Sequence, residues 1–430
     1  MRILIVSYAF PPFNDIGHVR VGKTAKYLEQ LGHDLRVLTA GDQPHAKSLP
    51  VEIDPAHIVS TAWWNVNRPA EVVFGGRATV ARRGLVVRGR ARRLIEWLRR
   101  MYRQTYKACI GFPDDCIGWY PFAVRAGSRL VESWRPDVIY ASAMPYTSLL
   151  VAARLSREYE IPWVAELRDL WVDFHRYRFG RMRRWVEGRL ERRVLSSATG
   201  FVTVSEPLAA TLRTKYGKPT AVVLNGFDGD YEMEAPPPAT DSSVLRIVYT
   251  GIMYEGRQDP SPLFAALRDM GMDARGIRVE FYGRYLEPAR ETAARFCLQG
   301  VVVNGQVSYA EAIHLQRQAD VLLLLLWTDI NERGVYTGKI FEYVGARRPI
   351  LGVGPSGSVA SDLLSERGLG FSSDDPALIR GQLVTWLKQK QAKGCLPSPP
   401  SEARQGLSRL EQTRILDEFL RSLVVNRSCA

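Results

Sequence analysis

The sequence predicts an α/β protein with two domains, each built on a parallel sheet, and three observations carry this prediction. Short aliphatic and β-branched runs alternate with longer helical patterns along most of the 430 residues, as they do in βαβ units. The apolar runs are nearly continuous, which favours strands that are covered on both faces. A proline-rich segment interrupts the alternation near the middle of a chain that is too long for one average domain.

The first half of the chain supplies five predicted strands and one clearly delimited helix. The helical pattern over residues 17–33 ends at Gly32, since a glycine commonly follows the last turn of a helix. The predicted strands cover residues 2–10, 34–40, 136–143, 162–169 and 200–205. These elements place a first domain over residues 1–232.

The segment 233–243, MEAPPPATDSS, separates the two halves. Its three consecutive prolines fit neither a helix interior nor a central strand, so we interpret it as an interdomain linker. A second domain over residues 244–400 follows, and a final helical segment covers residues 401–430 after another proline-rich break. The predicted strands of the second domain cover residues 245–251, 278–284, 300–305, 320–327 and 348–354.

Composition and charge narrow the class of protein. The chain is 46% hydrophobic and 24% charged, without an apolar run of about 18 residues, so no transmembrane helix is expected. The amino-terminal segment lacks a signal-peptide cleavage pattern, and no C-x-x-C pair occurs among the five cysteines, which together favour a reducing cytoplasm. The net charge of +13 indicates an anionic partner: nucleic acid, an anionic membrane surface or a phosphorylated ligand.

The basic charge is concentrated in two clusters that also contain apolar side chains. Residues 77–107 hold ten Arg and one Lys against one acid, and residues 176–193 hold eight Arg against two Glu. Trp97 and Trp185 stand within these clusters, which favours helices that bind a membrane surface. A solvated arginine-rich face is the alternative. No nucleic-acid reader motif is present, so nucleic acid is not expected as the partner.

The run GVYTGKIFEYVGARRPIL, residues 334–351, places charge at the end of the most apolar predicted strand. Ligands of open α/β sheets bind outside the carboxyl ends of the strands, where helix amino ends attract anions. Lys339 follows Gly338 there, and Glu342 lies one turn later on the same face, so the run fits a nucleoside diphosphate. The spacing and Ile340 exclude a P-loop. The alternative is a solvated Lys339 and a Glu342 paired with one of the next two arginines.

An ordered set of motifs resembles the retaining GT-B glycosyltransferases of the large family-four group, over nearly the whole chain. The match is closest to the branch that builds bacterial cell-surface polysaccharides. The segments that carry it are ILIVSYAFPPFNDIGHVRVGKTAKYLEQLGHDLRVLTA, DVIYASAMP, RDLW, FVTVSEPL, VLNGFD, IVYTGIMYEGRQDP, FYGR and GKIFEYVGARRPIL. The resemblance implies two Rossmann-like domains that face each other across a cleft, with the last helix crossing back to the first domain.

The resemblance also implies an activity: transfer of a sugar from a nucleotide-sugar to an acceptor hydroxyl, with the anomeric configuration retained. The first domain would hold the acceptor, and the second the donor. No metal or other cofactor is expected, because cations of the protein would stabilise the leaving diphosphate and no His/Cys cluster is present. In this branch the acceptor is commonly lipid-linked, which implies a cytoplasmic protein that binds peripherally to the inner face of the membrane.

The family pattern assigns roles to individual residues of the second domain. Glu342 matches the glutamate that binds the donor ribose, and the preceding family glutamate falls on Gly334, so Glu332 is the candidate substitute. The family arginine after the first strand of this domain falls on Ile252, which leaves Arg257 and Lys339 as the cations for the diphosphate. The remaining donor-binding candidates lie in the same motifs: Gly251, Asn304, Gly305, Val307, Tyr336, Thr337 and Gly338.

In the first domain, Gly17 matches the loop that faces the transferred sugar and the diphosphate. Arg20 is a further donor-binding candidate, and His18 and Asp169 are catalytic candidates. His18 has the alternative of a polar first-turn residue, and Asp169 that of a partner for Arg168 or a helix cap. Two other classes of protein remain open at this point: a sugar-nucleotide epimerase with the same fold, and a non-enzymatic protein that binds RNA or anionic lipid.

Overall fold

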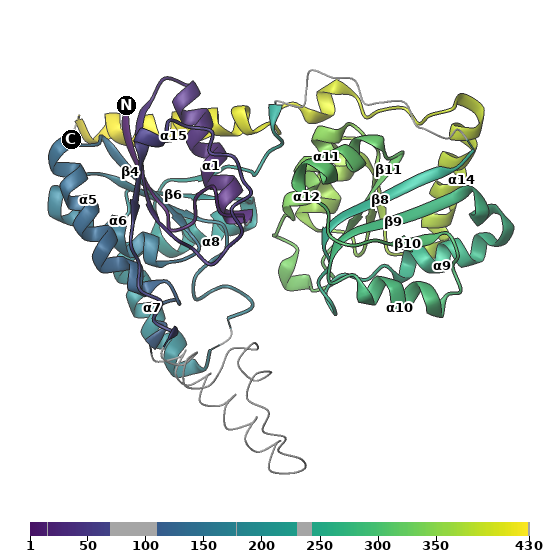
Figure 1. The fold of residues 1–430 in the computed structure, drawn as a ribbon, viewed down its shortest axis with the longest axis horizontal. Coiled ribbons are helices and arrows are strands. Elements are labelled where there is room, and N and C mark those ends of the chain that lie inside the picture. Colours follow the sequence, from purple (N-terminus) through teal and green to yellow (C-terminus); the bar gives the residue numbers. More distant parts are fainter. Residues whose placement is uncertain (15, 69–109, 178, 230–242, 429–430) are drawn as a thin grey trace, which may run out of the picture. The chain divides into compact units, whose positions relative to one another are not determined.

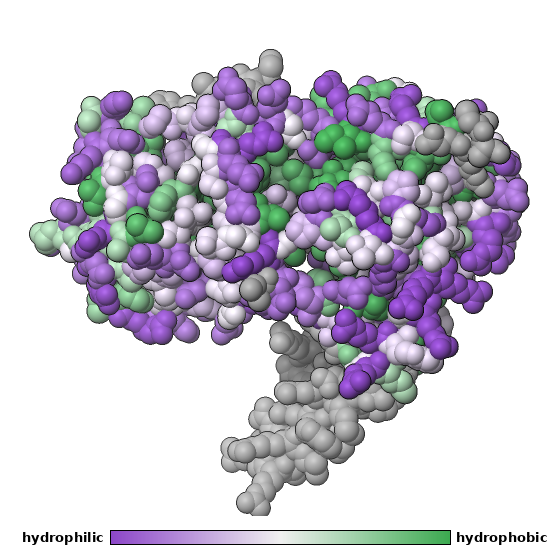
Figure 2. Space-filling model, turned by 180° about the vertical axis from the view of Figure 1, so that it is seen from behind, coloured by the Kyte–Doolittle hydropathy of each residue, from purple (hydrophilic) through white to green (hydrophobic). Residues whose placement is uncertain are grey.

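The computed structural model describes residues 1–14, 16–68, 110–177, 179–229 and 243–428 (Figure 1). Its contacts divide the chain into two compact units, Met1–Val223 with Thr413–Ala430, and Leu224–Gln412. Most of the predicted linker and the whole basic cluster 77–107, with Trp97, lie outside the described residues. Hydrophilic residues dominate the surface in Figure 2, with smaller groups of hydrophobic residues among them.

The first unit is built on a seven-stranded parallel sheet with the strand order β3-β2-β1-β4-β5-β6-β7. Consecutive residues of β1 point to opposite faces of this sheet: Leu4 and Val6 enter one apolar core, and Ile3 and Ile5 the other. This explains the continuous apolar pattern. The strands are Ile58–Thr61 (β3), Asp34–Ala40 (β2), Arg2–Val6 (β1), Val138–Ala143 (β4), Trp163–Leu167 (β5), Gly200–Thr203 (β6) and Thr220–Val222 (β7).

Helices cover both faces of this sheet (Figure 1). The main ones are α1 (Ile16–Gln30), α5 (Tyr120–Trp134), α6 (Thr147–Tyr159), α7 (Arg181–Leu195) and α8 (Glu206–Tyr216). The last helix, α15 (Arg409–Ser428), also belongs here, because Leu416, Leu420 and Leu423 join the core that contains Ile3 and Ile5. The prediction that the final helix returns to the first domain is therefore confirmed.

The second unit contains a six-stranded parallel sheet with the order β10-β9-β8-β11-β12-β13, the strand order of a Rossmann fold. The leucine run of β11 alternates between two cores: Leu323 and Leu325 enter one, and Leu322 and Leu324 the other. The strands are Val301–Val303 (β10), Ile277–Arg284 (β9), Leu245–Ile252 (β8), Val321–Leu325 (β11), Ile350–Val353 (β12) and Gly370–Ser373 (β13).

Six helices of eight or more residues lie within the described part of this unit: α9 (Ser261–Met270), α10 (Glu287–Arg295), α11 (Tyr309–Gln318), α12 (Gly338–Ala346), α13 (Val359–Glu366) and α14 (Pro376–Lys393). Of these, α11 and α12 pack against each other beside β8 and β11 and supply most of the candidate site. No helix in the described ranges of either unit is long and apolar enough to cross a membrane.

Candidate functional site

Lys339 lies in the first turn of α12, just beyond the carboxyl end of β11. Its Nζ donates hydrogen bonds to the Tyr249 hydroxyl at 2.5 Å and to the Ile252 carbonyl at 2.8 Å, and it lies 4.2 Å from the centroid of the Tyr249 ring. Burial lowers the pKa of Lys339 to about 7, although the Glu342 carboxylate acts in the opposite direction. Lys339 is therefore an enclosed amine with neutral partners, and the alternative of a solvated side chain is wrong.

Gly251 makes room for this amine. Its φ of +113° is one that side-chain-bearing residues rarely adopt, and a Cβ atom there would lie 2.6 Å from the Lys339 Cε. The glycine that the sequence places at the end of β8 is thus required by the position of Lys339, a contact between residues far apart in the chain.

Glu342 stands one turn after Lys339 and is also held by a neutral partner. Its Oε2 accepts a hydrogen bond of 3.1 Å from the Gln316 side chain on α11. Burial raises the pKa of Glu342, while the Gln316 hydrogen bond and the charges of Arg409 and Lys339 oppose this rise. Within the described part of the chain Glu342 forms no ion pair, and the guanidinium of Arg348 instead donates to the Arg317 carbonyl at 2.8 and 3.0 Å.

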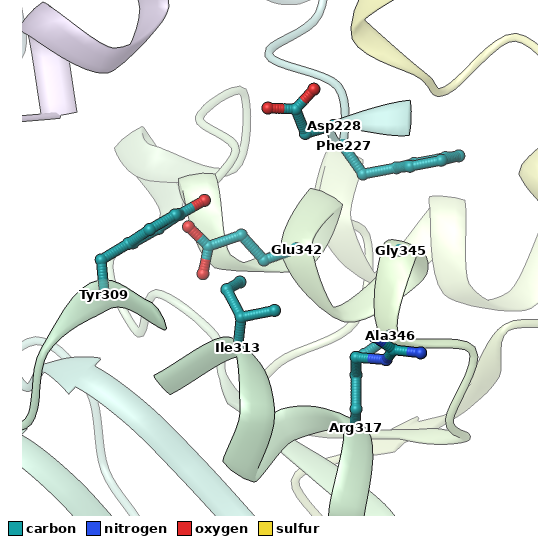
Figure 3. A pocket seen from close by; sticks show the side chains of 8 residues that line it. All are labelled: Phe227, Asp228, Tyr309, Ile313, Arg317, Glu342, Gly345 and Ala346. Carbon is teal, nitrogen blue, oxygen red and sulfur yellow. The ribbon is translucent and has the colours of Figure 1, made fainter. Parts of the chain in front are cut away.

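The Glu342 carboxylate lines a small pocket between α11 and α12 (Figure 3). The Tyr309 ring and the Glu342 carboxylate point toward one another across it, and the Asp228 carboxylate projects from the segment above. The other lining residues are Phe227, Ile313, Arg317, Gly345 and Ala346. Carboxylate oxygens beside an aromatic ring suit a ligand that has hydroxyl donors and a flat ring.

The amino end of α12 has a polar group without a hydrogen-bond partner. Thr337 is the N-cap residue, and its buried Oγ1 makes no hydrogen bond within the described residues. Gly338 begins the helix, whose first N–H groups have no intrahelical acceptors. Tyr336 packs against Phe341, with 5.5 Å between the ring centroids. This helix end can therefore accommodate an anion.

Arg257 and Glu332 form an ion pair with each other. One guanidinium nitrogen lies 3.0 and 3.1 Å from the two carboxylate oxygens, and Glu332 is only 1% exposed. Arg257 also lies between aromatic rings, 4.9 Å from the Tyr254 centroid and 4.5 Å from that of Trp327. The structure thus joins the candidate cation to the candidate substitute for the missing glutamate, while Gly334 lies in the loop between Glu332 and α12.

The candidate base-binding segment follows β10. The Asn304 N–H donates to the Phe281 carbonyl at 2.8 Å, and the Gly305 carbonyl accepts from the Gly283 N–H at 3.1 Å. Val307 precedes α11, whose N-cap is Ser308. The backbone of the segment is therefore tied to β9 immediately before the helix that carries Tyr309 and Gln316.

Arg20 belongs to a buried charge network in the first unit. Its Nε lies 2.8 Å and its second guanidinium nitrogen 2.7 Å from Oε1 of Glu166, and it also donates to the Val223 carbonyl at 2.9 Å. Ser142 donates to the other Glu166 oxygen, and Glu166 has no exposed surface. This pairing accounts for Arg20 without a ligand, and no local pattern near Glu166 predicts its role as the partner.

Gly17 and His18 occupy the start of α1 in different surroundings. A Cβ atom at Gly17 would lie 2.9 Å from a guanidinium nitrogen of Arg168, so the glycine lets that guanidinium approach the helix end. His18 is 3% exposed, accepts or donates a hydrogen bond of 2.8 Å with Gln43, and packs 5.3 Å from the His45 ring. His18 is thus a buried polar residue in the first turn of α1, which agrees with the alternative given for it.

Asp169 lies at the carboxyl end of β5, next to Arg168. Burial raises the pKa of Asp169, and Arg168, His175 and Arg176 act in the opposite direction. Asp169 makes no hydrogen bond within the described residues, and it caps no helix, since the next one, α7, begins only at Arg181. Arg168 donates to the backbone carbonyls of Ala143, the last residue of β4, and of Met144, which fixes the guanidinium beside Gly17.

The described ranges contain no cluster of three or more His, Cys, Asp or Glu side chains that could hold a metal ion. One short motif nevertheless bears on metal binding. Asp228, which lines the pocket, begins the run Asp-Gly-Asp at residues 228–230, and this D-x-D spacing can hold a metal-bound diphosphate. The second aspartate lies outside the described residues.

Comparison with known proteins finds a family model similar to the first unit and solved structures with the same fold. Residues 17–226 match the family model of the glycosyl transferase 4-like domain, and no curated protein sequence matches the chain. The chain resembles the crystal structure of HepE from Anabaena with UDP and glucose, at 16% sequence identity over 98% of this chain and 100% of that one, with a TM-score of 0.58. It resembles the structure of sucrose-phosphate synthase from Thermosynechococcus elongatus at 13% identity over 100% of this chain and 97% of that one, with a TM-score of 0.56. It also resembles the lipopolysaccharide outer core galactosyltransferase WaaB, at 12% identity over 98% of this chain and 99% of that one, with a TM-score of 0.54. The predicted GT-B architecture of two Rossmann-like domains is confirmed, and residues 17–226 are similar to the glycosyl transferase 4-like domain.

Proposed function

We propose that the chain is a glycosyltransferase that moves a sugar from a nucleoside-diphosphate sugar to an acceptor hydroxyl with retention of the anomeric configuration, in cell-surface polysaccharide or glycolipid synthesis. The glycosyl transferase 4-like domain supports this activity, as do the similar structures of HepE with UDP and with UDP-glucose. The observation that carries the proposal is the arrangement of α12. Lys339 and Glu342 lie one turn apart there, each with neutral hydrogen-bond partners, and Glu342 lines the pocket between α11 and α12.

In this proposal the charged and polar groups of α12 bind the diphosphate and the ribose of the donor. The Lys339 amine and the free N–H groups at the helix end meet the diphosphate, with Thr337 Oγ1 as an additional donor. The Glu342 carboxylate accepts hydrogen bonds from the ribose hydroxyls, and Tyr309 offers a ring surface to the nucleotide. Asn304, Gly305 and Val307 contribute backbone groups near the base. Because charge grows on the departing diphosphate, Lys339 acts more strongly in the transition state than in the ground state.

Arg257 is the second cation of the proposed leaving-group site. Glu332 holds its guanidinium through one nitrogen, which leaves the rest of the planar group able to meet phosphate oxygens. Front-face retention needs no nucleophilic carboxylate, so a Glu332 that is committed to Arg257 is compatible with the reaction. Asp169 and Arg168 are the proposed acceptor contacts in the first unit. The protein cations supply the charge that a metal would otherwise supply.

The exposed face of α7 supports the proposal of a lipid-linked acceptor. The helix buries charge, since Arg183 and Glu187 pair 2.5 Å apart in the interior, and it exposes apolar side chains. Met182 is 81% and Trp185 59% exposed, among arginines on the same outer face. An arginine-rich surface with exposed apolar groups fits an anionic membrane interface, where each basic residue contributes about 1 kcal/mol.

A vesicle assay tests the membrane part of the proposal. We expect co-sedimentation with anionic but not with neutral vesicles, and weaker binding as salt rises. Replacing Arg189 and Arg193 by Ser should weaken it about thirtyfold, since two contacts of about 1 kcal/mol each are lost. The matched control replaces Arg125 and Arg129, two exposed arginines of α5, and should change binding less than threefold. If the wild-type protein does not co-sediment with anionic vesicles at low salt, a soluble acceptor is favoured instead.

A ligand screen followed by product analysis tests the activity. The tightest binder among UDP, ADP, GDP, CDP and dTDP, chosen by thermal shift, becomes the reference nucleotide, because a ligand that binds the folded state raises its stability. Glu342→Ala should bind this nucleotide ten- to a hundredfold more weakly, since a hydrogen bond to a charged group contributes roughly 1.5–3 kcal/mol. If none of the five nucleotides binds the wild-type protein, the proposal is overturned.

Product analysis then separates the classes of enzyme. With the matching nucleotide-sugar, glycosyl transfer should require an acceptor and should leave a product of retained configuration. Conversion of the sugar-nucleotide to its epimer without an acceptor would identify an epimerase instead. Transfer should persist in excess EDTA, because Lys339 and Arg257 neutralise the leaving group in this proposal. Complete loss, restored by Mg²⁺ or Mn²⁺, would point to the Asp-Gly-Asp run that begins at Asp228.

A further inference from the structure

Gln316 on α11 is a buried residue that contacts Glu342 directly. It has no exposed surface, and its Nε2 donates both hydrogens: one to the Thr250 hydroxyl at 2.9 Å and one to Glu342 Oε2 at 3.1 Å. An ionised carboxylate only accepts hydrogen bonds, so the amide nitrogen is the group that must face Glu342. The side chain therefore bridges the end of β8 and the outer face of α12.

The bridge is anchored at its far end. The Thr250 N–H donates to the Tyr343 hydroxyl at 3.2 Å, so the same threonine ties β8 both to α12 and, through its own hydroxyl, to Gln316 on α11. Thr250 and Tyr343 are both buried. A carboxylate held by a group that is itself fixed from two sides keeps one orientation, as a ligand-binding group requires.

The bridge is not explained by stability alone. The amide oxygen of Gln316 is buried and has no hydrogen-bond partner within the described residues. A buried acceptor that stays unsatisfied costs free energy, and an apolar side chain of the same shape would avoid this cost. An unsatisfied group in a native interior calls for another reason for its presence.

We propose that Gln316 is a positioning residue for donor binding, which holds the Glu342 carboxylate ionised and aimed into the pocket at the ribose hydroxyls. This inference rests on the proposed function. Gln316 contacts no part of the donor itself. It acts through Glu342, whose carboxylate it fixes by one of its two N–H groups, while the second oxygen of the carboxylate remains available to a ligand.

The charges around Glu342 agree with this role. Burial raises the pKa of Glu342, and the Gln316 hydrogen bond is the largest of the influences that lower it, ahead of Arg409 from the start of α15 and Lys339 from its own helix. Tyr309, Arg317 and Asp228 line other parts of the same pocket. Without the amide, Glu342 would protonate at a higher pH and lose its strength as an acceptor.

The test is a double-mutant cycle in the intact protein, with calorimetric titration of the reference nucleotide. Gln316→Met keeps the size of the side chain and removes its donors. We expect about tenfold weaker binding, with the acidic loss of affinity shifted to higher pH. In a Glu342→Ala background the same substitution should change affinity less than twofold, because the group through which it acts is gone. Gln318→Met, at the end of the same helix, is the matched control and should behave as wild type.

A second measurement isolates the contribution of the ribose hydroxyls to nucleotide affinity. The wild-type protein should bind the reference nucleotide more tightly than its 2′,3′-dideoxy form, and this preference should shrink in Gln316→Met by the same factor as the affinity. If Gln316→Met lowered nucleotide affinity equally in the wild-type and Glu342→Ala backgrounds, Gln316 would have a merely structural role and the inference would be overturned. An unchanged ribose preference would overturn it too. Both results leave the proposed function standing, whereas failure of the wild-type protein to bind any nucleotide removes its basis as well.

Discussion

Each domain carries a cation and a carboxylate near the carboxyl ends of its strands, and the two pairs are held in different ways. In the first unit Arg20 and Glu166 are joined at 2.7–2.8 Å and both are buried, which makes them a closed pair. In the second unit Lys339 and Glu342 form no ion pair. The amine bonds to a hydroxyl and a carbonyl, and the carboxylate to an amide, so they form an open pair.

The difference indicates two uses of buried charge. The members of a closed pair compensate each other, and removing one leaves an uncompensated charge in the interior, so the closed pair matters for stability. The members of an open pair keep most of their capacity for an outside charge or hydroxyl, and their burial is a cost that a ligand can offset. We therefore expect the closed pair to control folding and the open pair to control donor binding and turnover.

The largest expected effect is on the closed pair. Glu166→Ala leaves Arg20 buried without its carboxylate, and we expect the free energy of unfolding to fall by roughly 3–5 kcal/mol. Chemical denaturation monitored by circular dichroism measures this. Glu158→Ala, which removes an exposed partner of Arg154, serves as the control and should cost less than about 1 kcal/mol. A Glu166→Ala protein as stable as that control would show that the closed pair does not support the fold.

The next effect is on turnover. Lys339→Met removes the enclosed amine from the proposed leaving-group site, and kcat should fall by roughly a hundred- to a thousandfold, as when one preorganised donor is removed elsewhere. Steady-state kinetics with the nucleotide-sugar and its acceptor measure it, and Lys388→Met on the exposed face of α14 is the control. Turnover within twofold of wild type would remove Lys339 from the site.

These contrasts also show what the sequence could and could not predict. The strands and α12 were predictable because hydrophobic period and helix signals are local, and the run 320–342 places Lys339 and Glu342 at a strand end by itself. The partners of these residues were not predictable. Gln316 lies 26 residues before Glu342, and Tyr249 lies 90 before Lys339, so the fold alone brings them together.

The same limit explains the first unit. Arg20 and Glu166 are 146 residues apart, and nothing near either one marks it as half of an ion pair. Arg20 was therefore a donor-binding candidate, because it follows Gly17 and His18 in the segment that carries the family resemblance. Features that depend on residues near in the sequence, such as strands and helix ends, could be predicted. Contacts between residues far apart in the sequence could not.

A smaller effect concerns pH. The free protein holds Lys339 with a pKa lowered to about 7, so the amine is largely neutral above that pH. A bound diphosphate favours the ammonium form, and binding above pH 7 must then take up a proton. The affinity for the reference nucleotide should therefore fall as pH rises beyond about 7, by up to about tenfold per pH unit.

Calorimetry in two buffers with different ionisation enthalpies measures this proton uptake directly. It should approach one proton per nucleotide on the alkaline side of pH 7 and vanish in Lys339→Met. Uptake that is equal in the wild-type and Lys339→Met proteins would assign the proton to another group and leave the amine without a part in diphosphate binding.

The most direct test of the distinction between the two pairs compares Glu166→Gln with Glu342→Gln, each assayed for unfolding temperature and for affinity to the reference nucleotide. We expect the two substitutions to have opposite effects on stability and on affinity. Glu166→Gln should lower the unfolding temperature by several degrees and leave the affinity within twofold of wild type. Glu342→Gln should weaken binding about tenfold, because a charged acceptor is lost, and should leave the unfolding temperature unchanged or higher, because burial of that charge is costly. An unchanged nucleotide affinity in Glu342→Gln, or an unchanged unfolding temperature in Glu166→Gln, would contradict the distinction between the two pairs.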